Sequence, residues 1–349
     1  MFEFQIVKIL LLASLSFVFA LICTPLLTHF LYKYKLGKQI RNNGTTPIFS
    51  QLHAHKAGTP TMGGVLIWGT LLIFVIVFFY LGKLIPSLSG LNFFSRSETL
   101  LPLGILLLSA LVGLVDDWLD IRGKGKGGLR MKHRLLIYAI IATIGACWFY
   151  FKLDWTTLHL PFLGNFEIGP WYIPFFVFVI VASAFSVNES DGLDGLAGGT
   201  LLFSYAAMGV ICFVLGRYDL AVFCGVIIGG LLSFLWFNIP PARFYMGDTG
   251  AMSLGITLGV IALLTNTALI LPVIGSVFVI ESVSVIIQLT SKKLRKGKKV
   301  FLSAPIHHHF QAIGWSESKI VMRFWVIAGM SAAVGLIIFL LDKGFQKFF

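Results

Sequence analysis

Residues 100–120 read LLPLGILLLSALVGLVDDWLD, an apolar run that ends in the paired aspartates Asp116 and Asp117. A helix needs about 20 mostly apolar residues to cross the hydrocarbon core of a bilayer. The run therefore predicts a transmembrane helix over 100–118. An acid at the centre of such a helix costs about 2.5–3.5 kcal/mol on insertion, and the two carboxylates avoid this cost by lying at the water boundary.

Similar apolar stretches recur along the chain and decide its class. Of the 349 residues, 57% are hydrophobic and 12% are charged, and the mean hydropathy is +0.89. Soluble domains are only about half apolar. We therefore predict a single all-α, multi-pass membrane domain over residues 1–349, with about ten transmembrane helices. These are expected at 4–32, 62–81, 100–118, 134–151, 170–187, 200–215, 220–238, 250–265, 270–290 and 322–341.

The distribution of basic residues predicts how the chain is oriented. The net charge is +12, and most of the 27 Lys and Arg residues fall in loops that follow the odd-numbered spans. Because positively charged loops stay in the cytoplasm, these loops are predicted to be cytoplasmic and both termini to be outside. A basic chain can also indicate nucleic-acid binding, but membrane topology accounts for this charge, and we predict no nucleic-acid partner.

Acidic residues gather in the same loops, which topology does not explain. The segment VNESDGLDGLAGG, residues 187–199, holds Asp191 and Asp194 three positions apart, so that they share a face if the segment is helical. Its glycines allow a backbone or a ligand to approach closely. The segment has no Lys or Arg, which favours a bound cation, although a glycine-rich turn at a helix start would look the same.

A third acidic loop is FNIPPARFYMGDTG, residues 237–250, in which Asp248 lies in a tight turn between glycines. Acids from three loops on one membrane face form an oxygen-rich set, which suits Mg²⁺ bound through one or two carboxylates and substrate phosphates. The nearby Lys and Arg suit a pyrophosphate. The sequence therefore predicts a magnesium-dependent phosphate site at the cytoplasmic face.

The segment APIHHHFQ, residues 304–311, contains the consecutive histidines His307, His308 and His309. Three consecutive residues cannot share one face of a helix, since successive side chains point about 100° apart. This spacing argues against a zinc site made of three histidines. It favours a role in contacting substrate or in neutralising phosphate.

Five motifs in order resemble those of the phospho-N-acetylmuramoyl-pentapeptide transferase family, within the polyprenyl-phosphate N-acetylhexosamine-1-phosphate transferase superfamily. The unbroken histidine triplet favours this branch over relatives that act on UDP-GlcNAc. The motifs are GTPTMGG (58–64), the Asp116–Asp117 pair, DGLDGLAGG (191–199), YMGDTG (245–250) and PIHHHF (305–310).

The resemblance implies a reaction and its partners. UDP-MurNAc-pentapeptide and undecaprenyl phosphate would give lipid I and UMP, with Mg²⁺, in the bacterial inner (cytoplasmic) membrane. This is the first membrane step of peptidoglycan synthesis. The family also implies a homodimer.

The resemblance also implies roles for single residues. Asp116 and Asp117 match the paired aspartates, one of them a proposed base or contact to the lipid phosphate. Asp248 matches the magnesium ligand, and Asp191 an active-site acid that we expect to be a second ligand. His308 joins this catalytic set. Contacts to substrate are expected from Lys56, Asn188, Asp194, Asn238, His307 and His309.

This chain departs from the family pattern near the paired aspartates. Asp120 stands where the family usually has a lysine, so Arg122, Lys124 or Arg134 is expected to replace that lysine as a phosphate contact. In addition, Glu189–Ser190 stands where Leu-Thr is usual. These changes affect donor binding and leave the reaction class intact.

There are two alternatives, one to the reaction mechanism and one to the class of protein. Direct attack by the lipid phosphate is favoured over an aspartyl-phosphate intermediate, because a phosphate monoester with a second pKa near about 6 is already largely dianionic. A transporter or lipid flippase would instead carry ionisable residues at mid-membrane. Only Glu281 lies deep inside a predicted span, where a functional and a structural role are equally compatible with the sequence.

Overall fold

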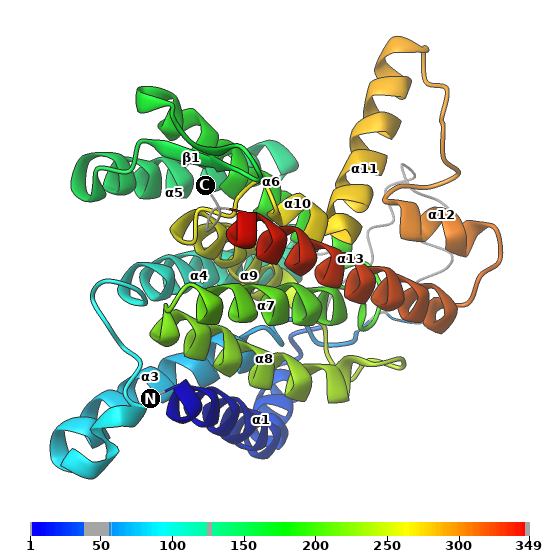
Figure 1. Ribbon diagram of the computed structural model, residues 1–349. Helices are drawn as coiled ribbons and strands as arrows, with labels where there is room; N and C mark the ends of the chain where they lie inside the picture. Colours follow the sequence, from blue (N-terminus) through cyan, green and yellow to red (C-terminus); the bar gives the residue numbers. More distant parts are fainter. Residues whose placement is uncertain (1, 38–55, 57, 124–127, 346–349) are drawn as a thin grey trace.

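The computed structural model describes residues 2–37, 56, 58–123 and 128–345, and this part of the chain is almost entirely helical (Figure 1). Within it, nine helices are long and apolar enough to cross a membrane, so the chain is a multi-pass membrane protein. The helices are α1 (Phe2–Lys33), α3 (Val65–Leu84), α4 (Leu100–Arg122), α5 (Met131–Leu153), α6 (Tyr172–Ser190), α7 (Leu196–Val214), α8 (Tyr218–Asn238), α9 (Gly247–Leu264), α10 (Leu271–Ile274), α11 (Ser276–Leu294), α12 (Ile306–Ala312) and α13 (Glu317–Phe345), with 3₁₀ turns η2 (Pro86–Leu91) and η3 (Gly169–Trp171).

Nine of the ten predicted spans correspond to these nine helices, but the prediction of one continuous helix over 270–290 was wrong. The chain breaks at Gly275 between the short α10 and α11. α11 is not among the nine, because its buried face is polar and its last turn carries Lys292 and Lys293. That buried face includes Glu281, Ser282, Ser284, Gln288 and Ser291.

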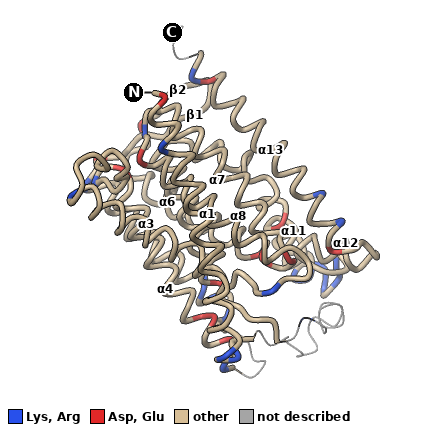
Figure 2. Tube along the Cα trace, turned by 90° about the horizontal axis from the view of Figure 1, so that it is seen from below, with Lys and Arg blue, Asp and Glu red and all other residues tan. Residues whose placement is uncertain are grey.

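Both ends of the described chain lie at the same end of the helical bundle. The ring of Phe2 packs against Phe213 with centroids 4.9 Å apart. Lys343 Nζ donates to the carbonyl of Val214, 2.5 Å away. Figure 2 shows the termini beside the hairpin of β1 (Thr157–Leu160) and β2 (Gly164–Glu167), with α12 toward the other end. Termini at one end require an even number of chain traverses, and the broken pair α10 and α11, between α9 and α13, adds one traverse to the nine long helices.

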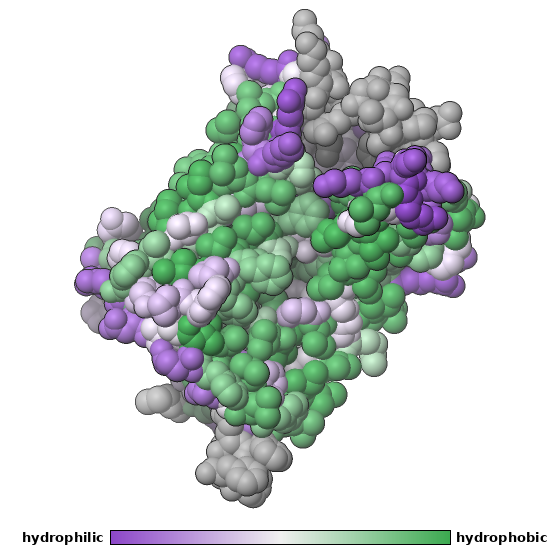
Figure 3. Space-filling view, turned by 90° about the horizontal axis from the view of Figure 1, so that it is seen from above, coloured by the Kyte–Doolittle hydropathy of each residue, from purple (hydrophilic) through white to green (hydrophobic). Residues whose placement is uncertain are grey.

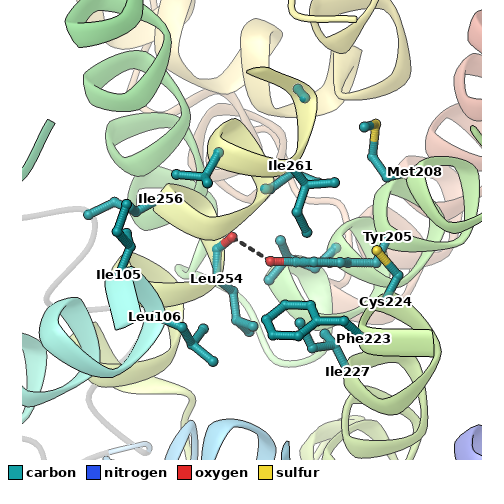
Figure 4. Packing of buried hydrophobic residues seen from close by; sticks show 14 of the residues in the cluster. Ile105, Leu106, Tyr205, Met208, Phe223, Cys224, Ile227, Leu254, Ile256 and Ile261 are labelled. Atoms are coloured by element: carbon teal, nitrogen blue, oxygen red, sulfur yellow. Dashed lines mark hydrogen bonds between the residues drawn. The ribbon is translucent and has the colours of Figure 1, made fainter. Parts of the chain in front are cut away.

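The centre of the bundle is formed by α8 and α9. α1 and α7 pack on α8, whereas α4 and α6 pack on α9. In the core, the Tyr205 hydroxyl donates to the carbonyl of Leu254 at 2.8 Å (Figure 4). A Cβ on Gly113 would lie 2.5 Å from the backbone of Asp248, and so glycine lets α4 approach the start of α9. This close approach brings two acidic motifs together.

The outer surface is apolar where a bilayer would surround it. Large hydrophobic side chains are exposed there, among them Leu26, Phe178 and Trp236. Figure 3 shows hydrophobic residues across the middle of one face and hydrophilic residues at its edges. In water such a patch would be unfavourable, since soluble proteins rarely expose more than a few hundred Å² of contiguous apolar surface.

Candidate active site

Asp117 lies against the N-terminus of α9 and binds its backbone. Oδ1 accepts a hydrogen bond from the N–H of Asp248 at 3.0 Å, and Oδ2 accepts one from the N–H of Thr249 at 3.1 Å. Gly247 has φ of +74°, and a Cβ there would lie 2.5 Å from Oδ2. The first N–H groups of a helix have no partner within it and attract negative charge. The Asp117 carboxylate therefore caps α9 and fixes the position of Asp248.

Arg134, on α5, joins side chains from three other helices. Its guanidinium lies 2.6 Å from Oδ2 of Asp248 and 2.7 Å from Oδ2 of Asp116. It also donates to the Asn188 side-chain oxygen at 3.1 Å, while the Asn188 amide donates to Asp248 at 2.5 Å. Two carboxylates therefore share one cation here.

Of the three basic residues expected to replace the missing lysine, Arg134 is the one that reaches the paired carboxylates in the described structure. Arg122 instead lies over the ring of Trp118, 4.0 Å from its centroid. Lys124 lies outside the described residues. Asp120, which takes the lysine position, is buried within α4.

Lys56 forms a second charged cluster at the same end of the bundle. Its Nζ lies 2.6 Å from Asp194 and 2.5 Å from Glu317, and its side chain is 11% exposed. Glu317 also accepts the backbone N–H of Asp194 at 2.7 Å. The cluster ties the segment before α3 to the starts of α7 and α13. Lys56 and Asp194, both expected to contact substrate, therefore contact each other, and their substrate role stays a prediction.

Replacing Lys56 with methionine is expected to destabilise the protein by about 3–5 kcal/mol, because Asp194 and Glu317 would keep their burial and lose their shared cation. The measurement is the melting temperature in detergent. Lys319→Met removes the same charge from an exposed position over Trp315 and should leave the melting temperature nearly unchanged. Equal melting temperatures for the two variants would contradict the stabilising role of the cluster.

Asp191 follows the last residue of α6 and lies toward the Lys56 cluster. Burial, together with the charges of Asp194, Glu317 and Asp191, raises the pKa of Tyr245 well above its usual value. Tyr245 therefore remains a protonated phenol at neutral pH. The expected sharing of one metal ion by Asp191 and Asp248 stays a prediction.

Asn238, expected to line the cleft, is buried at the end of α8. Its side-chain oxygen accepts the N–H of Gly195 at 2.9 Å, and its amide donates to the carbonyl of Phe244 at 2.8 Å. Asn238 therefore braces the start of α7 against the loop that leads to Asp248.

The three histidines of α12 have different partners. His307 Nδ1 lies 2.8 Å from Oε2 of Glu281, and both side chains are fully buried. His308 Nδ1 lies 2.8 Å from the Gln311 side-chain oxygen, and His309 Nδ1 accepts the N–H of Leu302 at 3.2 Å. Burial and the nearby charge of Lys56 lower the pKa of His307 to about 3, so that its ring is neutral at pH 7.

The donor groups at Arg134 suit a magnesium ion that is completed by substrate. In the described part of the chain, no group of three or more His, Cys, Asp or Glu is arranged to hold a metal alone. Mg²⁺ commonly uses one or two carboxylates, with substrate phosphates and water completing the octahedron. Asp248 and Asp116, brought together at one guanidinium, supply such a pair of carboxylates.

Sequence comparisons cover the part of the chain that carries these residues. Residues 99–266, which include Asp116, Asp117, Asp191 and Asp248, match the family described as Glycosyl transferase family 4. Residues 56–67 match the Phospho-N-acetylmuramoyl-pentapeptide-transferase signature 1.

Full-length relatives are similar over most of the chain. A phospho-N-acetylmuramoyl-pentapeptide-transferase of Chloroflexus aggregans is 38% identical over 343 residues, covering 94% of this chain and 89% of the relative. Proteins with the same name are 37% identical in a Geobacillus species, covering 93% of this chain and 95% of the relative, and 38% identical in Clostridium perfringens, covering 92% and 95%.

Proposed function

The chain belongs to the phospho-N-acetylmuramoyl-pentapeptide transferase family, and we propose that it transfers phospho-MurNAc-pentapeptide from UDP-MurNAc-pentapeptide to undecaprenyl phosphate, giving lipid I and UMP. The observation that carries this proposal is the convergence of Asp116, Arg134, Asn188 and Asp248 at one end of an apolar bundle. There, a lipid phosphate can arrive through the bilayer and a nucleotide from water. The bilayer is the bacterial inner membrane.

Phosphoryl transfer requires positioning and neutralisation of charge more than covalent help from the protein. Asp248, with Asp116 beside it, would hold Mg²⁺, and Asp191 is a further candidate ligand. Mg²⁺ held by these carboxylates would supply Lewis-acid chemistry, which neutralises charge on the donor phosphates and on leaving UMP. Asn188 and the Asp117 cap orient Asp248 from two sides.

Arg134 and Asp116 would act on the phosphates. A guanidinium can bind two phosphate oxygens at once and keeps its charge when partly buried. Asp116 would orient the lipid phosphate or take its last proton, while that phosphate attacks the donor directly. The acceptor needs little deprotonation, since the second pKa of a phosphate monoester is near about 6.

The test is release of UMP by the detergent-purified protein with undecaprenyl phosphate, Mg²⁺ and UDP-MurNAc-pentapeptide. EDTA is expected to abolish turnover, and Asp248→Asn to reduce it at least about 100-fold, as losing one preorganised electrostatic group does in other enzymes. The matched control is Asp342→Asn, which changes a buried, hydrogen-bonded aspartate at the opposite end and should retain turnover.

The same assay with UDP-GlcNAc as the donor measures which nucleotide sugar the protein accepts. UMP from UDP-GlcNAc alone would move the chain to the sister branch of the superfamily. A folded protein that releases UMP from neither donor would contradict the proposed function and favour a transporter.

A further inference from the structure

Glu281 lies on the buried face of α11 and holds a histidine of the α12 motif. Its Oε2 is 2.8 Å from Nδ1 of His307, and both side chains have no exposed surface. One proton lies between these two atoms. Since a buried polar group without a partner costs about 1–3 kcal/mol, this contact fixes the orientation of the imidazole. The mechanism described above does not use Glu281.

The other side of the same ring faces the acidic motif. A Cβ on Gly192 would lie 2.3 Å from Nε2 of His307 and 3.2 Å from Nε2 of His308, so the two rings lie directly against this glycine. The ring centroids are 4.1 Å apart, with an angle of 64° between the planes. Gly192 follows Asp191. The position of His307 therefore determines where the chain beside Asp191 can lie.

α11 also binds the segment at 298–301, which leads from the end of α11 back toward α12. Gln288 accepts the N–H groups of Val300 and Phe301 at 2.9 and 3.0 Å, and Ser291 donates to the carbonyl of Lys298 at 2.9 Å. Figure 1 shows α11 projecting from the bundle with α12 beside its lower part. Of Glu281, Gln288 and Ser291, Glu281 is the most buried, and its partner is a side chain of the histidine motif, His307.

We propose that Glu281 is a positioning residue, which acts through His307 to hold the histidine triplet against the Gly192 turn and so sets the place of Asp191 and His308 in the donor site. The assignment of a donor site rests on the proposed function. The contact explains how a fully buried carboxylate is tolerated, since a buried charge is costly without a partner.

A double-mutant cycle of Glu281 and His307 tests the proposal. Glu281→Leu is expected to lower kcat/KM for UMP release about 10- to 100-fold, since a shift of about 1 Å in a positioned group can cost 100-fold. In the His307→Ala background, the same change should cost several-fold less, because the imidazole through which Glu281 acts is gone and only the backbone N–H groups of Ile306 and His307 remain as its partners. Gly192→Ala should lower kcat/KM by a similar factor, as its methyl group would displace the rings.

Conservative variants separate positioning from simple stability. Glu281→Gln keeps the length of the side chain and can donate to Nδ1 or accept from it, so kcat/KM should stay within about threefold of the unsubstituted protein. Glu281→Asp is one methylene shorter and should fall to the level of Glu281→Leu. If Glu281→Leu does not fold, the comparison of Glu281→Gln with Glu281→Asp still tests the proposal. A lower kcat/KM for Glu281→Gln than for Glu281→Asp would overturn it.

The matched control is Gln288→Leu, which removes buried hydrogen bonds from the same helix without touching His307. It should lower the melting temperature, and its effect on kcat/KM should add to that of His307→Ala. If the unsubstituted protein is active and the losses in kcat/KM from Glu281→Leu and His307→Ala are additive, this inference is overturned and the proposed function is not. If the unsubstituted protein releases no UMP, the proposed function fails, and the same cycle is then scored on the rise in melting temperature caused by added UMP.

Discussion

Replacing Arg134 with glutamine is expected to lower the rate of UMP release at least about 100-fold and, at the same time, to make the melting temperature respond to Mg²⁺. In the ligand-free protein, the guanidinium holds Asp116 and Asp248 at 2.7 and 2.6 Å. Without it, two carboxylates stay close together with no cation between them. A divalent ion can take that place, and binding to the folded state raises its stability.

The measurement is a melting curve with increasing MgCl₂, compared with NaCl at equal ionic strength. The unsubstituted protein should show a small response, and Arg134→Gln a larger one. Arg134→Lys, which keeps the charge but reaches fewer oxygens, should lie between them. Arg217→Gln, before α8 at the opposite end of the bundle, is the control and should behave like the unsubstituted protein. Equal responses from Arg134→Gln and the unsubstituted protein would contradict the view that Arg134 occupies the cation position.

Nine of the ten predicted spans were confirmed as long helices, because the thickness of a bilayer sets a minimum length for each crossing. The break at Gly275 could not be found in this way, since apolar residues continue on both sides of it. The polar face of α11 could not be found either, because it is satisfied by the loop at 298–302 and by His307. A hydropathy window does not detect such partners, because they become neighbours only when the chain folds back.

The acidic motifs could be recognised from composition and spacing, whereas the contacts between them could not. Arg134 was one of three candidates for a missing lysine, and only the packing of α5 against α6 and α4, which brings it to Asp116 and Asp248, distinguishes it. Glu317 precedes the predicted span at 322–341, but nothing in the sequence links it to Lys56, 261 positions away. The two backbone groups that bind Asn238 could not be read from the sequence, and its expected contact with substrate stays a prediction.

The paired aspartates also show that contacts could not be read from the sequence. Their substitution is the second change for which we expect a large effect. The sequence made Asp116 and Asp117 equivalent candidates for contact with the lipid phosphate. In the structure, Asp116 contacts Arg134, while Asp117 caps the helix that carries Asp248. Adjacent positions on a helix point about 100° apart, and so the two carboxylates reach different partners.

Asp117→Asn and Asp116→Asn are therefore expected to fail in different ways. An asparagine at 117 presents an amide to two helix N–H donors, so the cap is weakened by about 0.5–2 kcal/mol and Asp248 is displaced. The melting temperature should fall, and turnover should fall about 100-fold at low Mg²⁺, with part of the rate recovered at high Mg²⁺. Asp116→Asn leaves the cap intact but removes a carboxylate that is proposed to act on the lipid phosphate as well as to hold Mg²⁺, so part of its loss of rate should persist even at saturating Mg²⁺. UMP release across a Mg²⁺ titration, with melting curves for both variants, provides the comparison. An Asp117→Asn protein that melts like the unsubstituted one and is not rescued by Mg²⁺ would show that Asp117 acts on the reactants directly, because displacement of Asp248 would then no longer account for the loss.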